Sequence, residues 1–200
     1  ASLTSAAQSP VSVTLSNGAV ITIAAGSSSV SVSVAAPTDD VYLDAGSVSV
    51  TIDSASGGNF ESLAVNPAPA TTSITDTIDT TAATLTATST VAEGGAITYT
   101  VTLGAPVTGS AVVVTLAGGQ LITIPVGSSS STATGTAPDN MYAGGGSVAN
   151  HIVSATGGNF EQLTPNTVPV TTTVTDDADI TTVTLTATNS VVEGGNITYT

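Results

Sequence analysis

Residues 97–103 read ITYTVTL, and this stretch decides the fold. Ile97, Tyr99, Val101 and Leu103 fall on one side of an extended chain, and the threonines between them fall on the other. A period of two is typical of a β-strand with one buried face, whereas a helix needs apolar residues every three or four positions. The stretch therefore predicts a half-buried strand.

The same alternation recurs along the chain, with glycine-rich turns between the runs. Val30, Val32 and Val34 alternate with serines, and Val48, Val50 and Ile52 alternate with Ser49 and Thr51. Within one stretch of about 100 residues the pattern predicts seven short strands, a number typical of an immunoglobulin-like β-sandwich. The predicted fold class is all-β, as tandem seven-stranded immunoglobulin-like or cadherin-like sandwiches, with no helix. The seven strands are expected at residues 83–88, 96–103, 111–117, 120–126, 130–136, 147–154 and 167–175.

The chain contains an internal repeat of about 100 residues, which is the sequence signature of a repeat architecture. Residues 57–63 return at 157–163, and residues 72–100 return at 172–200. Ala1 aligns with Val101, so residue 1 resumes the period where Thr200 stops. We expect residues 1–78 to be a repeat without its first strand, 79–178 a complete repeat, and 179–200 the first strands of the next.

Two explanations fit this phase. Either a longer array of repeats continues at both ends, or the C-terminal strands complete a neighbouring chain by strand donation, as a subunit of a filament would. The longer array is favoured, so the expected partners are neighbouring repeats of the same chain.

The composition excludes several classes of partner. The chain has no Lys, Arg or Cys, 14 acidic residues and a net charge of -14, yet 40% of it is hydrophobic. That apolar content is too high for a disordered acidic tail. Without cations the chain cannot neutralise phosphates, so we expect no nucleic acid partner and no binding to anionic membranes. No apolar run is long enough for membrane insertion of this segment.

The acidic residues gather in loops, and tracing the strands assigns these loops to the ends of the repeats. One end of the complete repeat is expected to collect Glu93, Asp139, Asn140, Asp176, Asp177 and Asp179. The corresponding end of the first repeat is expected to collect Asp39, Asp40, Asp76 and Asp79, facing Asn159 and Glu161 of the loop at 157–161. Asp44 and Asp53 fit neither group and are expected to be plain surface charge.

We expect such groups of acidic side chains to be neutralised by a cation. Two carboxylates without a cation between them repel by about 1 kcal/mol per close pair near water. Ca²⁺ accepts six to eight oxygen ligands in flexible geometry, whereas Zn²⁺ prefers Cys and His, and His151 is the one His in the chain. The prediction is Ca²⁺ at the ends of the repeats. The alternative is that the acidic residues only solvate the surface.

No catalytic constellation is found, so an enzyme is not expected. His151 has Thr51 as its repeat counterpart, is expected to face solvent, and has no partnered nucleophile. Direct binding of ice, a glycan or a partner cell remains an alternative because the strands are rich in Thr. A twisted sheet is a poor flat template for ice, and Trp for stacking on sugars is absent.

Three strings carry a family resemblance: VTLSNG at 13–18, ATGGNFEQLTP at 155–165 and VVEGGNITYT at 191–200. They resemble the tandem repeats of giant bacterial biofilm adhesins of the LapA-like and BapA-like type, exported by type I secretion, including long RTX adhesins. The resemblance implies extracellular immunoglobulin-like extender modules on the bacterial surface, acting in cell adhesion and biofilm formation. The ligand of the adhesin tip would lie outside this segment.

The resemblance also implies Ca²⁺ at junctions between modules, held by a Glu of the first turn and Asp residues of the linker. Matched to this sequence, the turn residues are Glu93 and Glu193, and the loop partners are Asp40 and Asp139. The linker residues are Asp76, Asp79, Asp176 and Asp179. In that family the metal would stiffen an extended rod. The glycine-rich nonapeptides of RTX segments are absent from this chain.

Overall fold

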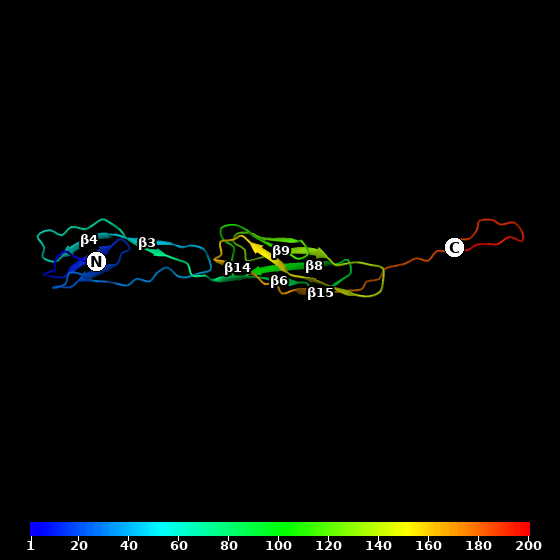
Figure 1. The fold of residues 1–200 in the computed structure, drawn as a ribbon, viewed down its shortest axis with the longest axis horizontal. Helices are drawn as coiled ribbons and strands as arrows, with labels where there is room; N and C mark the ends of the chain where they lie inside the picture. Colours follow the sequence, from blue (N-terminus) through cyan, green and yellow to red (C-terminus); the bar gives the residue numbers. More distant parts are fainter. The chain divides into compact units, whose positions relative to one another are not determined.

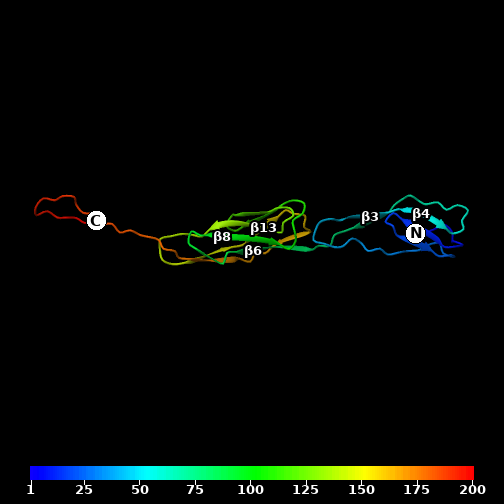
Figure 2. The same ribbon diagram turned by 180° about the vertical axis from the view of Figure 1, so that it is seen from behind.

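A computed structural model describes residues 1–200. The chain is all-β without any helix, which confirms the all-β part of the prediction. No helix is therefore present that could cross a lipid bilayer. The chain divides into two compact units (Figures 1 and 2). Unit 1 comprises Ala1–Thr80 with Phe160–Gln162, and unit 2 comprises Thr81–Asn159 with Leu163–Thr200.

Unit 2 is built around three sheets. A four-stranded sheet has the order β11-β8-β6-β14, and two three-stranded sheets have the orders β10-β9-β13 and β12-β15-β7. Most of these strands lie roughly along a common axis, in both senses (Figure 1). Their bounds are β6 Thr80–Ala87, β7 Thr90–Ala92, β8 Ala96–Leu103, β9 Val112–Leu116, β10 Leu121–Ile124, β11 Ser130–Thr136, β12 Gly146–Asn150, β13 Ile152–Thr156, β14 Gln162–Pro165 and β15 Val170–Thr175.

Strand β8 supplies much of the core of unit 2. Ile97, Tyr99, Val101 and Leu103 are all at most 4% exposed, while the threonines between them face outward or are half-buried. β8 pairs antiparallel with β11 on one side and β6 on the other. The predicted bounds of β8 and β11 are confirmed, because a period of two identifies a strand with one buried face. One buried face on each sheet is consistent with a β-sandwich.

The predicted single strand at 147–154 is wrong in one respect, because it is two strands that meet at His151. β12 pairs with β15, whereas β13 pairs with β9, so the chain moves from one sheet to another at this residue. Asn150 holds the corner: its Oδ1 accepts hydrogen bonds from the backbone N–H groups of Gly118 (3.3 Å) and His151 (3.0 Å). His151 is half-buried at this corner and does not stand free in solvent.

Two short strands were not predicted, β7 and β14. β7 spans three residues and pairs in parallel with β15. β14 lies at the edge of the four-stranded sheet beside β6. Runs this short carry too few alternations for a period to be recognised.

Unit 1 has two sheets, with the orders β2-β1-β4 and β3-β5. Its core is the cluster Ala7, Val11, Val13, Ile21 and Ile23. The strands are β1 Val11–Leu15, β2 Val20–Ile23, β3 Gly46–Val50, β4 Ile52–Gly57 and β5 Ala70–Ile74.

The alternation of Val30, Val32 and Val34 predicted a strand that unit 1 does not form. Residues 31–36 have no strand pairing, and Val32 and Val34 are 54% and 66% exposed. In unit 2 the corresponding strand β11 is paired along its length with β8. In unit 1 the pairing stops at Val30, whose N–H donates to the carbonyl of Ala1. A strand needs a partner for its backbone groups, and the pattern of side chains cannot supply one.

Candidate cation site

The candidate site in unit 2 begins where two parallel strand ends meet. β7 and β15 run in parallel, with Thr175 opposite Ala92. The backbone N–H of Glu93 donates to the carbonyl oxygen of Thr175 at 2.9 Å, and the Thr175 hydroxyl donates to the carbonyl oxygen of Val91 at 3.2 Å. Because parallel strands end on the same edge, Glu93 and Asp177 leave the sheet side by side.

A tight turn brings a third carboxylate to this edge. Gly94 has a φ of +67°, in the left-handed region that favours glycine, and its N–H donates to the carbonyl of Pro138 at 3.4 Å. The Asp139 side chain lies directly against Gly94: a Cβ on Gly94 would be 3.6 Å from its Oδ2. The loop at 138–142 is thus held over the turn.

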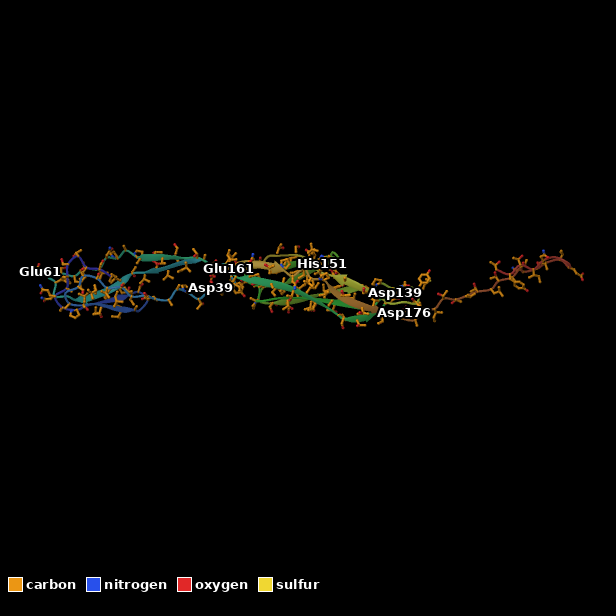
Figure 3. All side chains as sticks on the ribbon, turned by 60° about the horizontal axis from the view of Figure 1, so that its bottom comes forward. Asp39, Glu61, Asp139, His151, Glu161 and Asp176 are labelled. Atoms are coloured by element: carbon orange, nitrogen blue, oxygen red, sulfur yellow. The ribbon has the colours of Figure 1, made fainter.

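These elements place three acidic side chains together, which we call the Glu93 cluster: Glu93, Asp139 and Asp177. Their carboxylate oxygens lie within 4.8 Å of one another. Figure 3 shows Asp139 and Asp176 near each other at one end of unit 2, away from His151.

Glu93 is the unusual member of the cluster, because its side chain is buried. It is 8% exposed, whereas Asp139 and Asp177 are exposed. Its Oε1 accepts a hydrogen bond from Asn140 Nδ2 at 3.0 Å, but its Oε2 is buried without a hydrogen-bond partner. A buried carboxylate oxygen that lacks a donor costs free energy, and a cation bound here would give this atom a partner.

Asp179, two residues after Asp177, lies in the field of these acids. Partial desolvation, together with the charges of Asp177, Asp139 and Asp176, raises the pKa of Asp179 above its usual 3.8. A raised carboxyl pKa means that the ionised form is disfavoured. The charges of Asp139 and Asp177 thus reach Asp179. Only Glu93, Asp139 and Asp177 have carboxylate oxygens that converge.

Hard oxygen donors of this kind fit Ca²⁺ better than a transition metal. The cluster offers carboxylates without any Cys or His, and Asn140 lies in contact with Glu93. Oxygen-only sets suit Ca²⁺ or Mg²⁺, and the exposed members leave room for the several further ligands that Ca²⁺ accepts.

The acids of unit 1 form a second group, called the Asp44 group: Asp39, Asp40, Asp44 and Asp76. The Asp44 N–H donates to Asp76 Oδ2 at 3.2 Å. The charge of Asp40, followed by desolvation and by Asp76 and Asp39, raises the pKa of Asp44 above its usual 3.8. Asp44 was expected to be plain surface charge; it is exposed, and it lies near the predicted acids Asp40 and Asp76. Its repeat counterpart is Gly144, so the repeat itself gave no signal for it.

The Asp44 group lacks a buried carboxylate such as that of Glu93. Thr77 stands where the second repeat has Asp177, and its hydroxyl donates to both oxygens of Asp39 at 2.8 Å. Asp39, Asp40 and Asp44 are exposed and Asp76 is half-buried, so no acid of this group is buried as Glu93 is. Unit 1 thus has the neutral hydroxyl of Thr77 at the position where unit 2 has the carboxylate of Asp177.

The remaining predicted ligands are spread out. Glu161 Oε2 accepts a hydrogen bond from the backbone N–H of Asp79 at 2.6 Å, and the Glu161 N–H donates to the Val41 carbonyl at 3.0 Å. Next to Glu161, the ring of Phe160 stacks on Tyr42 with centroids 5.5 Å apart. Asn159 belongs to unit 2 and lies beside Gly109, and Glu193 is exposed.

Comparison with known proteins identifies the family of the chain. A model of the LapA domain matches residues 1–77 and 79–177. The chain belongs to the LapA domain family. Membership supports an adhesin-related role in adhesion and a location at the cell surface. No curated protein and no solved structure matches the chain. Within this LapA domain chain, the second matched range contains all three residues of the Glu93 cluster.

Proposed function

We propose that this chain is part of the extender region of a bacterial adhesin, secreted by the type I route. In this proposal it is a rod of tandem immunoglobulin-like repeats that Ca²⁺ stiffens and that holds a ligand-binding tip away from the cell in biofilm formation. The internal repeat and membership of the LapA domain family support the extender role. The absence of Cys from the sequence excludes disulfides as the stiffening device.

The single observation that carries the metal proposal is the buried Oε2 of Glu93. It has no hydrogen-bond donor and lies with the carboxylates of Asp139 and Asp177 within 4.8 Å. At this separation two unit charges repel by about 1 kcal/mol in water and several times that where the site is partly buried. A divalent cation removes this repulsion and supplies the missing partner of Oε2.

Glu93, Asp139 and Asp177 would hold the ion, which supplies positive charge and no chemical reaction. Glu93 would anchor it from the turn after β7, Asp177 from the end of β15, and Asp139 from the loop over Gly94. Asn140 keeps the Glu93 carboxylate in place through its Oε1. Because these three segments are distant in sequence, the ion would bind the folded unit and not the unfolded chain, and would stabilise it.

The direct test is calorimetric titration of the 200-residue chain with Ca²⁺. We expect one dominant site, with a dissociation constant on the order of 10⁻⁴–10⁻³ M as in other extracellular modules, and at most weaker binding of Mg²⁺. Asp177→Asn should weaken this binding at least about tenfold, since one ligand charge is lost.

Asp53→Asn is the matched control, because Asp53 is exposed on β4 in unit 1 and belongs to neither acidic group. It removes the same charge and should leave the affinity unchanged. If the two variants weaken binding equally, Ca²⁺ responds only to net charge. If wild type shows no saturable heat, the metal proposal is wrong.

A further inference from the structure

Unit 1 includes three residues that the sequence repeat assigns to the second repeat, Phe160–Gln162, which we call the Phe160 segment. The segment follows β13, and its last residue is the first residue of β14. Its contacts, and not its place in the sequence, put it in unit 1. Unit 1 therefore has a binding surface for a segment of the second repeat.

The apolar part of this surface is the ring of Tyr42. Phe160 stacks on it, with ring centroids 5.5 Å apart and an angle of 26° between the ring planes. Phe160 is only 6% exposed, and Tyr42 is half-buried. Stacked aromatic rings attract each other beyond the effect of the area that they bury. Phe160 is thus the apolar anchor of the segment.

The backbone adds a short antiparallel bridge. Tyr42 lies opposite Phe160, and the N–H of Glu161 donates to the carbonyl oxygen of Val41 at 3.0 Å. Because this hydrogen bond joins the residues that flank the pair, Tyr42 and Phe160 form a non-hydrogen-bonded pair, in which the side chains of the two strands lie closest. The bridge fixes the register of the Phe160 segment on unit 1.

The two polar side chains of the segment bind the stretch of chain that leads into β6. Glu161 Oε2 accepts a hydrogen bond from the backbone N–H of Asp79 at 2.6 Å, and the Thr80 hydroxyl donates to Gln162 Oε1 at 2.6 Å. Glu161 and Asp79 are both half-buried. A carboxylate that accepts from an N–H makes a charge-assisted hydrogen bond, which is about twice as strong as a neutral one.

The loop of unit 1 that presents Tyr42 is itself held by hydrogen bonds between protein groups. The Tyr42 N–H donates to Asp40 Oδ1 at 2.8 Å, and the Thr77 hydroxyl donates to both oxygens of Asp39 at 2.8 Å. The second bond ties this loop to the chain just before Asp79. Neither bond involves a cation, so the binding surface does not need one to form.

We propose that unit 1 binds the Phe160 segment as a metal-independent junction between successive repeats. Phe160 is the anchor, and Glu161 is the latch that closes on the Asp79 N–H. Glu161 was predicted as a metal ligand, but here its carboxylate accepts a hydrogen bond from the protein itself. The role of this junction in a rod rests on the proposed function, whereas the contact requires neither Ca²⁺ nor the Glu93 cluster. All tests are made in EDTA, so the failure of this proposal and that of the Ca²⁺ proposal are distinguishable.

The first experiment is amide hydrogen exchange of the 200-residue chain in EDTA, followed by NMR. We expect slow exchange at Glu161 and Asp79, because both N–H groups are donors in the junction. Glu161→Ala removes the acceptor of the Asp79 N–H and should speed its exchange at least about tenfold. Glu61→Ala is the matched control, because Glu61 is the exposed repeat counterpart of Glu161, and it should leave exchange at Asp79 unchanged.

The second experiment uses the absence of Cys from the sequence, which makes an engineered pair a clean reporter. Residues opposite each other in a non-hydrogen-bonded pair have Cα atoms about 4.5 Å apart, within the reach of a disulfide. Tyr42→Cys with Phe160→Cys should therefore form a disulfide within one chain in air, in EDTA and at low protein concentration. Thiol titration and non-reducing mass spectrometry measure it.

The matched control for the Cys pair is Tyr142→Cys with Phe160→Cys. It replaces the same residue types, since Tyr142 is the repeat counterpart of Tyr42, but Tyr142 is 75% exposed and is not paired with Phe160. This variant should keep both thiols.

Four results would overturn the proposal. In wild type they are exchange at Glu161 and Asp79 as fast as in an unfolded chain, or protection that appears only when Ca²⁺ is added. In the variants they are unchanged exchange at Asp79 in Glu161→Ala, or a Tyr42→Cys, Phe160→Cys pair that stays reduced like its control. The wild-type measurement needs no substitution, so the proposal can be refuted even where a variant does not fold.

Discussion

The backbone N–H of Glu93 and the carbonyl oxygen of Thr175 form a 2.9 Å hydrogen bond, which ties together the two strand ends from which the Glu93 cluster arises. The bond holds Glu93 in a buried position beside Asp177, where its Oε2 has no donor. A buried carboxylate oxygen without a donor destabilises the folded unit, and a bound cation would give this atom a partner.

Replacing the Glu93 carboxylate by an amide should change stability in opposite directions with and without metal. In EDTA, Glu93→Gln removes repulsion worth about 1 kcal/mol and should raise the melting temperature of unit 2 by about 4–8 °C. In 10 mM Ca²⁺, wild type should gain about 1.4–2.7 kcal/mol from binding, and the variant should gain little. Thermal melts followed by circular dichroism test both arms.

Asp53→Asn again serves as the control for Glu93→Gln, because it changes net charge equally at an exposed site. It should show the wild-type response to Ca²⁺. A Glu93→Gln variant that melts lower than wild type in EDTA would contradict the view that the buried carboxylate destabilises the metal-free unit.

The corner at Asn150 should be sensitive to truncation. Asn150 is 3% exposed, and its amide bonds to Gln120 as well as to the backbone of Gly118 and His151. Asn150→Ala leaves these groups unpaired and should lower the free energy of unfolding of unit 2 by about 1–3 kcal/mol. Urea unfolding measures this loss. Ser147→Ala, on the exposed side of the same strand β12, should stay within about 0.5 kcal/mol of wild type.

Two glycines with similar backbone angles should differ in their tolerance of alanine. Gly157 has a φ of +97°, and a Cβ there would lie 2.2 Å from the carbonyl oxygen of Ala111. Gly119 has a φ of +80° with no atom within 4 Å of an added Cβ. Gly119→Ala should cost about 1–2 kcal/mol from the left-handed backbone alone. Gly157→Ala should cost clearly more in the same unfolding experiment, and equal losses would contradict the close approach.

Stability in metal-free buffer should fall as the pH rises through the acid range. The pKa of Asp44 is raised above its usual 3.8, chiefly by Asp40, so the folded chain holds more protons than the unfolded chain between these two pKa values. By linkage, the contribution of Asp44 is most favourable below 3.8 and is lost as the pH passes the raised pKa.

Melting temperatures from neutral pH down to about 4 test this expectation for Asp44. Asp44→Asn should weaken the fall of melting temperature with rising pH. Asp53→Asn should leave that fall unchanged, because Asp53 is not among the charges that raise the pKa of Asp44. An identical slope in wild type and Asp44→Asn would show that Asp40 does not act on Asp44.

The sequence alone determined the class of secondary structure and the chemistry of the candidate site. The alternation in 96–103 and 130–136 identified both strands with their bounds, because the period of a strand is written in its own side chains. The repeat and the lack of Lys and Arg limited the options to a modular acidic protein whose loops offer oxygen donors. These features depend only on neighbours in the chain.

The tertiary structure decided which strands pair and which acidic side chains converge. Val30, Val32 and Val34 have the pattern of a strand but no strand to pair with, and the run at 147–154 divides between two sheets at His151. Of the acids, Glu93 and Asp177 meet because β7 pairs with β15 across 83 residues of sequence, as Thr90 opposite Thr173 shows. Asp139 joins them from the loop that is hydrogen-bonded to Gly94. Pairing across such distances depends on backbone hydrogen bonds and shared burial, which no local pattern encodes.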